Sequence, residues 1–134
     1  AFKESEKTSL IRQFESSASY FEPFFNVLFE KEVQLGLIKM QQGFKHCIHN
    51  DFIDNGGITH RVIIQINDGW ETNYGGETLI FASENENDLS YIYPPFPNLA
   101  LGFEISNKSY HAVTEVKDPS FTRFSLVLSF RQKQ

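Results

Sequence analysis

Cysteine and long apolar runs are nearly absent from this chain. Cys47 is the single cysteine among 134 residues, which excludes an internal disulfide framework and indicates a reducing compartment. No apolar run approaches the roughly 18 residues that a membrane-spanning helix needs, and no basic segment with a following apolar stretch predicts a secretory signal. We therefore expect a cytoplasmic location and no membrane partner.

Positive charge is also scarce. The chain has 12 Lys and Arg residues against 17 Asp and Glu, a net charge of −5, so we expect no nucleic-acid partner. Hydrophobic residues make up 40% of the chain, enough for one globular domain over residues 1–134. The chain begins at Ala1 and not at a methionine, so we expect that an upstream segment was removed or lies outside this sequence.

The hydrophobic pattern predicts a mainly β fold. Ser5 or Thr8 is suited to cap a first helix, Pro23 to start a second over Phe24–Glu30, and residues 1–32 then form a helical support. Alternation predicts strands near residues 33–40, 46–51, 61–67, 77–82, 90–93, 99–105, 111–116 and 121–131. Eight strands separated by turns favour a double-stranded β-helix, or jelly roll, over residues 33–134, with the helices covering one sheet.

The motif H-x-D, followed by a distant histidine, suggests a metal site. His49 and Asp51 are two residues apart, and His111 follows 60 positions later. Residues i and i+2 of a strand point to the same side, so His49 and Asp51 are expected to face one interior. Two imidazoles and one carboxylate on one face of a metal are typical of non-haem Fe(II) oxygenases, because the opposite face stays open.

An arginine in the last strand suggests an anion site. Arg123 and Ser125 share one face of the strand 121–131, opposite an apolar face that includes Phe124 and Leu128. A buried arginine is costly without an anionic partner, and its guanidinium grips a carboxylate through two parallel hydrogen bonds. An arginine on a wet edge strand is the alternative. The upstream H-x-D and histidine favour the carboxylate clamp.

The order His49-x-Asp51, His111, Arg123-x-Ser125 resembles that of the Fe(II)/2-oxoglutarate-dependent dioxygenases, in particular their prolyl-hydroxylase-like branch. The stretches Arg61–Trp70 and Tyr74–Phe81 are similar to that branch's strand, N-x-x-W turn and G-G-x-L-x-x-F strand. The resemblance extends from about Gly43 to Phe130, roughly two thirds of the chain.

This resemblance implies an enzyme and its cofactors. His49, Asp51 and His111 would be the catalytic Fe(II) ligands, and 2-oxoglutarate would bind the metal and place its distal carboxylate on Arg123 and Ser125. The expected reaction consumes O2 and hydroxylates an unactivated C–H bond of an amino acid, a peptide side chain or a small metabolite, with release of succinate and carbon dioxide. Asp51 separates the chain from the halogenating members, which have a small residue that binds no metal at this position.

Three further residues follow from the resemblance. Gln65 occupies the position of a polar residue that often touches 2-oxoglutarate, although many members have tyrosine there. Thr78 is expected to face inward beside the methylene groups of the cosubstrate. Arg61 either meets a substrate carboxylate or pairs with an acidic residue near the rim. His46 and His60 lack the spacing to join the triad, and structural roles are expected for both.

Three other functions compete with the hydroxylase interpretation. A cupin-type metal-binding jelly roll is supported by the Gly43-x5-His49 spacing, but Asp51 replaces the second histidine of its first motif and the later P-x-G-x-x-H is missing. A catalytically silent ligand-binding module usually lacks a metal ligand, and no ligand is lost here. A nucleic-acid demethylase of the same superfamily would have an arginine at position 129, where this chain has Ser129.

Overall fold

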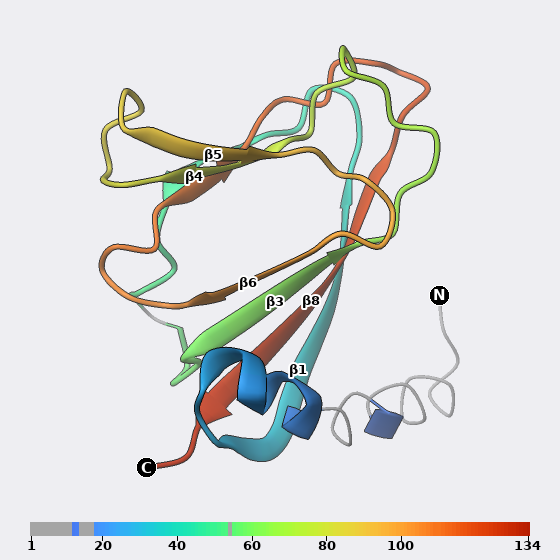
Figure 1. Cartoon of the computed structure of the whole chain (residues 1–134). Coiled ribbons are helices and arrows are strands. Elements are labelled where there is room, and N and C mark those ends of the chain that lie inside the picture. The colour runs from blue at the N-terminus through green and yellow to red at the C-terminus, as the bar shows by residue number, and fades with distance from the viewer. Residues whose placement is uncertain (1–11, 14–17, 54) are drawn as a thin grey trace.

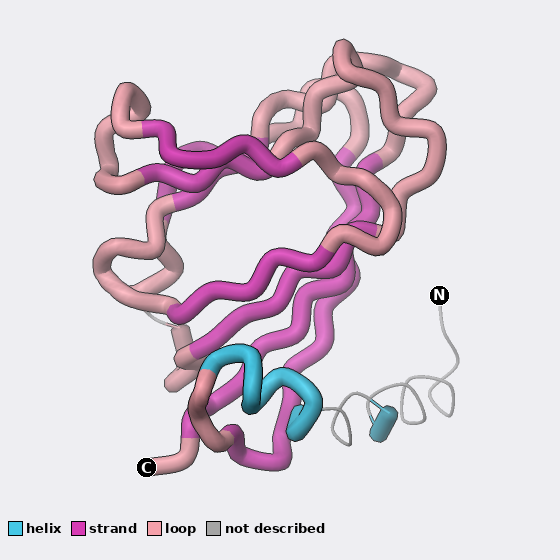
Figure 2. The backbone as a smooth tube through the Cα atoms, in the orientation of Figure 1, coloured by secondary structure: helices cyan, strands magenta, loops and turns pink. Residues whose placement is uncertain are grey.

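The computed structural model describes residues 12–13, 18–53 and 55–134, and eight strands form two antiparallel sheets within them (Figures 1 and 2). The strands are β1 (Phe29–Met40), β2 (His46–His49), β3 (His60–Gln65), β4 (Thr78–Phe81), β5 (Leu89–Tyr93), β6 (Ala100–Glu104), β7 (His111–Val113) and β8 (Arg123–Gln132). Each corresponds to one of the eight strands that the alternation predicts, with ends shifted by a few residues. The jelly-roll prediction is confirmed.

The two sheets have the orders β1-β8-β3-β6 and β2-β7-β4-β5. Most successive strands along the chain change sheet, and only the β4–β5 hairpin joins neighbours directly. The inner faces of the two sheets therefore face one another, and residues far apart in sequence line the space between them (Figure 1). This arrangement brings β2, β3, β7 and β8 together around one interior.

Strand β8 shows how alternation divides a strand between core and interior. Leu128 and Phe130 are fully buried in a hydrophobic cluster under the helical residues 18–25, on the outer side of the β1-β8-β3-β6 sheet. Arg123 and Ser125 point the other way, into the space between the sheets. Leu126, Leu128 and Phe130 thus anchor the strand, while the opposite face carries the polar groups.

The helical part differs from the prediction. The predicted helix caps, Ser5 and Thr8, lie outside the described residues, while the described residues 18–25 are helical and cover the sheet as expected. The second helix, Phe24–Glu30, is wrong: the backbone leaves the helix at Asn26, whose φ is 57°, and β1 begins at Phe29. Asparagine tolerates this left-handed conformation, so it ends the helix early. In the part of the chain that the structure describes, no helix is long and apolar enough to cross a membrane.

The Gly75-Gly76 pair makes room at the entry to β4. A Cβ atom on Gly75, whose φ is 74°, would lie 1.9 Å from the carbonyl oxygen of Glu115. A Cβ atom on Gly76, whose φ is 81°, would lie 3.2 Å from Cδ of Arg123. Only glycine fits both the conformation and the space. The pair therefore lets the backbone approach the segment that follows β7, and the Arg123 side chain, closely.

Candidate functional site

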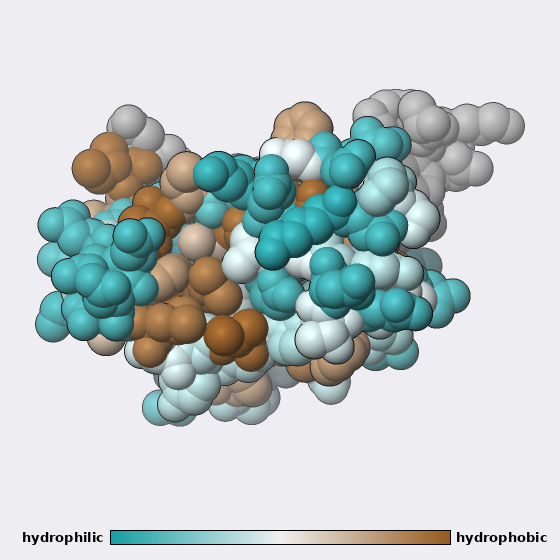
Figure 3. Space-filling model, turned by 90° about the horizontal axis from the view of Figure 1, so that it is seen from above, coloured by the Kyte–Doolittle hydropathy of each residue, from teal (hydrophilic) through white to brown (hydrophobic). Residues whose placement is uncertain are grey.

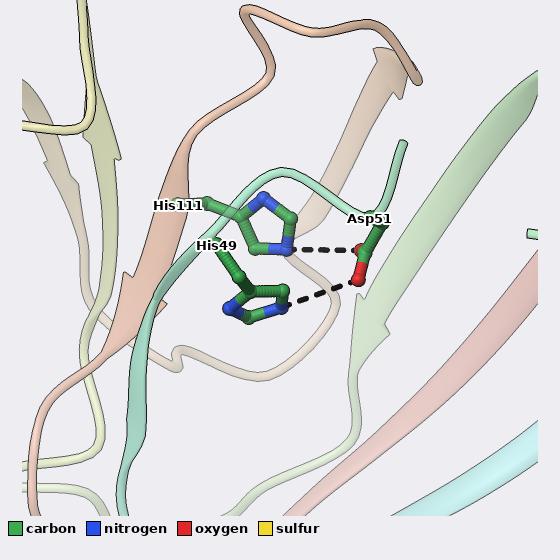
Figure 4. Close-up of side chains that lie close together, drawn as sticks. All are labelled: His49, Asp51 and His111. Carbon is green, nitrogen blue, oxygen red and sulfur yellow. Dashed lines mark ion pairs between the residues drawn. The ribbon is translucent and has the colours of Figure 1, made fainter. Parts of the chain in front are cut away.

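The three predicted metal ligands come together at the ends of two paired strands (Figure 4). His49 ends β2, His111 begins β7, and the two residues are register partners with ring centroids 4.3 Å apart. Asp51 lies beyond the end of β2 and has a φ of 61°, so strand alternation does not place it. The left-handed turn, which aspartate tolerates better than most residues, carries its carboxylate back toward the two rings.

The ligand atoms converge on one point. Nε2 of His49 lies 3.3 Å from Oδ1 of Asp51, and Nε2 of His111 lies 3.2 Å from Oδ2. One ligand atom from each residue lies within 4.8 Å of the others. Two imidazole nitrogens and a carboxylate at this spacing fit a single divalent metal ion and leave its other face free.

Backbone carbonyls fix the tautomer of both histidines. Nδ1 of His49 lies 2.7 Å from the carbonyl oxygen of Cys47, and Nδ1 of His111 lies 2.7 Å from that of Ser109. A carbonyl only accepts, so Nδ1 carries the proton and Nε2 keeps its lone pair for a metal. Ser109 also donates to the carbonyl oxygen of Asn50 at 2.7 Å, which ties the loop of Asp51 to the loop that precedes His111.

Hydrogen bonding to the two imidazoles controls the charge of the triad. Contacts with His111 and then with His49 hold the pKa of Asp51 well below its usual range, so this carboxyl stays ionised. The same contact with Asp51 raises the pKa of His49. The negative carboxylate of Asp51 therefore favours positive charge at the imidazole Nε2 atoms, where a metal cation would bind.

Arg61 pairs with the carboxylate of the triad. Its Nη1 lies 2.7 Å from Oδ2 of Asp51, and its Nε donates to Oγ of Ser129 at 3.2 Å. Of the two expected roles of Arg61, the structure contains the ion pair with an acidic residue. Both the guanidinium and His111 contact Oδ2 of Asp51, so Oδ1 is the carboxylate oxygen with more freedom to bind a metal.

Arg123 forms the second part of the site and is 3% exposed. Its Nε donates to the carbonyl oxygen of Gly76, Nη1 to Oγ of Ser125 and Nη2 to Oγ1 of Thr78, each at 2.9 Å. These acceptors are neutral, and no carboxylate of the described residues lies within 4.0 Å of the guanidinium. Burial lowers the pKa of Arg123 to about 10. A buried cation held by neutral groups alone favours an anionic ligand.

Gln65 lies behind this clamp. Its Oε1 accepts a hydrogen bond from Oγ of Ser125 at 3.0 Å and one from Nδ2 of Asn67 at 3.1 Å. Ser125, Thr78 and Arg123 line the cavity between the sheets, whereas Gln65 does not. The structure therefore links Gln65 to the cavity through the Ser125 hydroxyl.

One cavity of about 140 Å³ joins the triad to the clamp. This volume is many times the roughly 10–15 Å³ that a cavity needs to hold one water, so the space can hold a small ligand. Its polar wall contains the triad, Arg61, Thr78, Arg123 and Ser125. Its apolar wall contains Ile38, Met40, Ile63, Val113 and Val127. A ligand that bridges the metal position and Arg123 would place its middle against apolar side chains.

Six residues that line the cavity were not predicted as site residues, and His46 and Met40 are two of them. His46 received a structural role from its spacing, but it lines the cavity, with its ring 6.0 Å from that of His49. Met40 faces Arg123 across the β1–β8 register, and its sulfur lies 3.7 Å from Nη1. The alternation of β1 pairs Ile38 with Met40 on one face, and this pattern was the available signal.

Comparison with known proteins identifies relatives of the chain. The sequence model of the 2OG-Fe(II) oxygenase superfamily matches residues 35–131. No curated protein matches the sequence. Several solved structures have the same fold, and prolyl hydroxylases are among them.

The first of these structures is a Pseudomonas putida prolyl-4-hydroxylase, with a TM-score of 0.71 and 16% identity over 93% of this chain and 66% of that one. A viral collagen prolyl hydroxylase from Paramecium Bursaria Chlorella virus-1, in a 2OG complex, has a TM-score of 0.67 and 14% identity, over 99% of this chain and 78% of that one. A Trichoplax adhaerens prolyl hydroxylase, in complex with a peptide fragment of hypoxia inducible factor, has a TM-score of 0.62 and 18% identity, over 79% of this chain and 46% of that one. The chain spans less than two thirds of the first and third of these proteins. At these identities the matches establish the fold.

Proposed function

The chain belongs to the 2OG-Fe(II) oxygenase superfamily, and on that basis we propose that it is an Fe(II)- and 2-oxoglutarate-dependent hydroxylase. Its substrate is an amino acid, a peptide side chain or a small metabolite with an unactivated C–H bond. One oxygen atom of O2 enters that bond as a hydroxyl group, and the other enters succinate as 2-oxoglutarate loses carbon dioxide. The observation that carries the proposal is the joining of the triad and the anion-free Arg123 in one cavity.

The donor set fits the metal. His49 and His111 would hold Fe(II) through Nε2 and Asp51 through one carboxylate oxygen, while the Nδ1 protons stay on the backbone carbonyls. Bound together with 2-oxoglutarate, the iron supplies the oxidising chemistry that activates O2. Arg61 holds Oδ2 of Asp51, so the carboxylate keeps a single orientation.

The clamp fits a dicarboxylate cosubstrate. Arg123 binds the distal carboxylate of 2-oxoglutarate, assisted by the hydroxyl groups of Thr78 and Ser125. Gln65 contributes by orienting the Ser125 hydroxyl, to which it is hydrogen-bonded. The apolar wall packs against the methylene groups and keeps water from the guanidinium, which strengthens the ionic contact.

Arg61 also has a role in substrate binding. Its Nε and Nη1 are used by Ser129 and Asp51, but its Nη2 donates to no described residue. This nitrogen belongs to a side chain that lines the cavity beside the metal ligands. A carbonyl or carboxylate oxygen of the substrate therefore has a donor close to the reacting carbon.

Turnover of 2-oxoglutarate tests the proposal. The protein is loaded with Fe(II) and supplied with O2, and succinate is measured across a panel of free amino acids, short peptides and small metabolites. Peptides are included because the Trichoplax structure contains one. We expect succinate in stoichiometric amounts with one class of hydroxylated product. A cupin-type jelly roll or a silent binding module would give no succinate with any member of the panel, and that result would contradict the proposal.

A further inference from the structure

Strand β5 is an exposed sheet edge without the usual protection. Its five residues, Leu89 to Tyr93, include no charged residue, proline or glycine. Leu89 is 43% exposed, Tyr91 62% and Ile92 56%. Among the described residues the strand pairs with β4 alone, so every second residue directs its N–H and C=O groups away from the sheet.

The other three edges differ from β5. Strand β1 carries four charged residues: Glu30, Lys31, Glu32 and Lys39. Strand β2 is four residues long and its pairing with β7 is irregular. On β6, aromatic rings of Phe24 and Phe25 lie against Gly102, and Glu104 ends the strand. Charges, short length, irregular pairing and covering segments all block the addition of a further strand, so β5 is the edge that remains open to one.

The inner face of β5 is continuous with the metal ligands. Tyr91 is the register partner of Ile80 on β4, and Ile80 is the partner of His111 on β7. Neighbouring strands are about 4.8 Å apart, so a strand added to β5 would lie about 14 Å from β7. A segment docked there is too far from the triad to be the reacting group itself, but it lies beside the same interior (Figure 1).

An acidic turn adjoins this edge. Glu84, Glu86 and Asp88 are exposed in the turn that leads into β5, and none forms an ion pair within 4.0 Å with a described residue. Viewed from above the β2-β7-β4-β5 sheet, the surface has an apolar patch bordered by hydrophilic residues (Figure 3). Unpaired carboxylates beside an uncharged edge favour a partner that is extended and positively charged at one end.

We propose that β5 is a docking edge for an extended segment of a polypeptide substrate, which adds as a strand and places lysine or arginine residues on the acidic turn. The proposal rests on the hydroxylase function above and narrows its substrate class to polypeptides. An extended chain advances about 3.4 Å per residue, so the hydroxylated residue lies at least about four residues from the docked segment. Affinity then comes from main-chain ladder bonds and the acidic turn, away from the metal.

A peptide-binding experiment on metal-free protein tests the docking edge separately from catalysis. The probe is a fluorescein-labelled peptide of alternating valine and threonine that begins with a run of lysines. One control peptide has glutamates in place of the lysines, and another is N-methylated at every second residue and donates no ladder bonds on one edge. Fluorescence anisotropy gives the affinities, and amide chemical shifts locate the bound peptide.

We expect the lysine peptide to bind and to shift amide signals of β5. The double variant Glu84→Gln, Glu86→Gln should weaken binding about three- to tenfold, and Ile92→Lys should abolish it. Leu37→Lys, at an exposed position of β1, is the matched control and should leave binding unchanged. The Glu variants lie in an exposed turn, so they report even if Ile92→Lys fails to fold.

Equal binding of the N-methylated peptide, or shifts confined to another edge, would overturn the docking edge. A dimer in sedimentation velocity whose protomers bind no peptide would assign β5 to a second copy of the chain and also overturn it. Succinate formation plays no part in these measurements. A protein that binds the peptide at β5 but turns over no 2-oxoglutarate would keep the docking edge and contradict the hydroxylase proposal.

Discussion

The metal triad and the Arg123 clamp line one cavity but are held in different ways. The triad lies at strand ends and in a loop, with side-chain exposures of 38% for His49, 23% for Asp51 and 8% for His111. The clamp comes from the first residues of β8 and β4, which are inner strands of their sheets, and Arg123, Ser125 and Thr78 are at most 3% exposed. The triad therefore has access to substrate, while the clamp is part of the packed interior. Mutations in the two regions should separate chemistry from folding.

The largest effect is expected in the triad. Replacing His49, Asp51 or His111 with Ala removes one of three protein bonds to the metal, so turnover should be abolished while the fold survives. The free energy of unfolding should fall by about 1 kcal/mol for the partly exposed His49 and Asp51, and by more for His111, which is buried and packs against Phe103. Succinate release and thermal unfolding measure the two effects. An enzyme that keeps most of its activity after His111→Ala would contradict the assignment.

In the clamp, Arg123→Ala should raise the 2-oxoglutarate requirement far more than it lowers metal affinity. Truncation of one partner of a buried charge pair costs on the order of 2–5 kcal/mol. That range corresponds to roughly 30-fold to several thousand-fold in cosubstrate affinity. Arg123→Lys should restore only part of the lost cosubstrate affinity, because the point charge of an ammonium group does not reproduce the paired donors of a guanidinium. Titration of 2-oxoglutarate into the Fe(II)-loaded variants measures this affinity. An affinity of Arg123→Ala equal to that of the wild type would contradict the role of Arg123 in binding the cosubstrate.

Arg61 acts on the metal site through its ion pair with Asp51. Because it holds Oδ2 of Asp51 at 2.7 Å, Arg61→Gln should weaken metal binding about 10- to 100-fold. Ser129→Ala removes only the contact to Nε of Arg61 and should have a smaller effect. Titration of Co(II) into metal-free protein, followed by its visible absorption, measures both variants. Equal metal affinity in Arg61→Gln and wild type would show that Asp51 needs no such partner.

Gly75, which precedes the glycine that contacts Arg123, should matter for folding. Gly75→Ala should lower the free energy of unfolding by at least about 2 kcal/mol, because strain at positive φ adds to a clash with Glu115. Gly69→Ala is the matched control: its φ is 69°, but nothing lies within 4 Å of the added Cβ, so strain alone should cost about 1 kcal/mol. Urea unfolding of the two variants separates strain from clash. Equal losses would contradict the close approach at Gly75.

The smallest expected effect is on the pH dependence of stability, where His60 and His49 differ. Burial lowers the pKa of His60, which packs between Phe25 and Phe29, whereas Asp51 raises that of His49. Below the unfolded value of 6.5, the unfolded chain binds a proton at position 60 more readily than the folded protein. His60 therefore contributes stability above pH 6.5 that is lost as the pH falls below it. Urea unfolding from pH 7 to 5.5 should show a weaker decline in His60→Leu, and an unchanged slope would contradict this.

Much of the fold and of the site follows from the sequence, because both depend on local patterns. Period-two alternation locates all eight strands, and the spacing of His49, Asp51, His111 and Arg123 identifies residues that the structure brings to one cavity. A strand pattern assigns a side chain to a face, and a jelly roll turns the polar faces of its strands toward each other.

The remaining features depend on tertiary contacts that no local pattern encodes. The φ of Asn26 ends the helix before Phe29, and the φ of Asp51 replaces the strand geometry expected for the carboxylate. The contact between Arg61 and Asp51 forms only when β3 lies beside the end of β2. Likewise, Gln65 meets Ser125 through the β3–β8 register, and not the cavity.

Anaerobic addition of Fe(II) and 2-oxoglutarate to metal-free protein tests the central claim, that one cavity holds both a metal and a keto acid. A keto acid that binds the metal through two oxygen atoms gives a weak visible charge-transfer band. We predict this band with both components together, with neither alone, and in Arg123→Ala only at much higher 2-oxoglutarate concentration. A protein that stays colourless with saturating Fe(II) and 2-oxoglutarate would contradict the account.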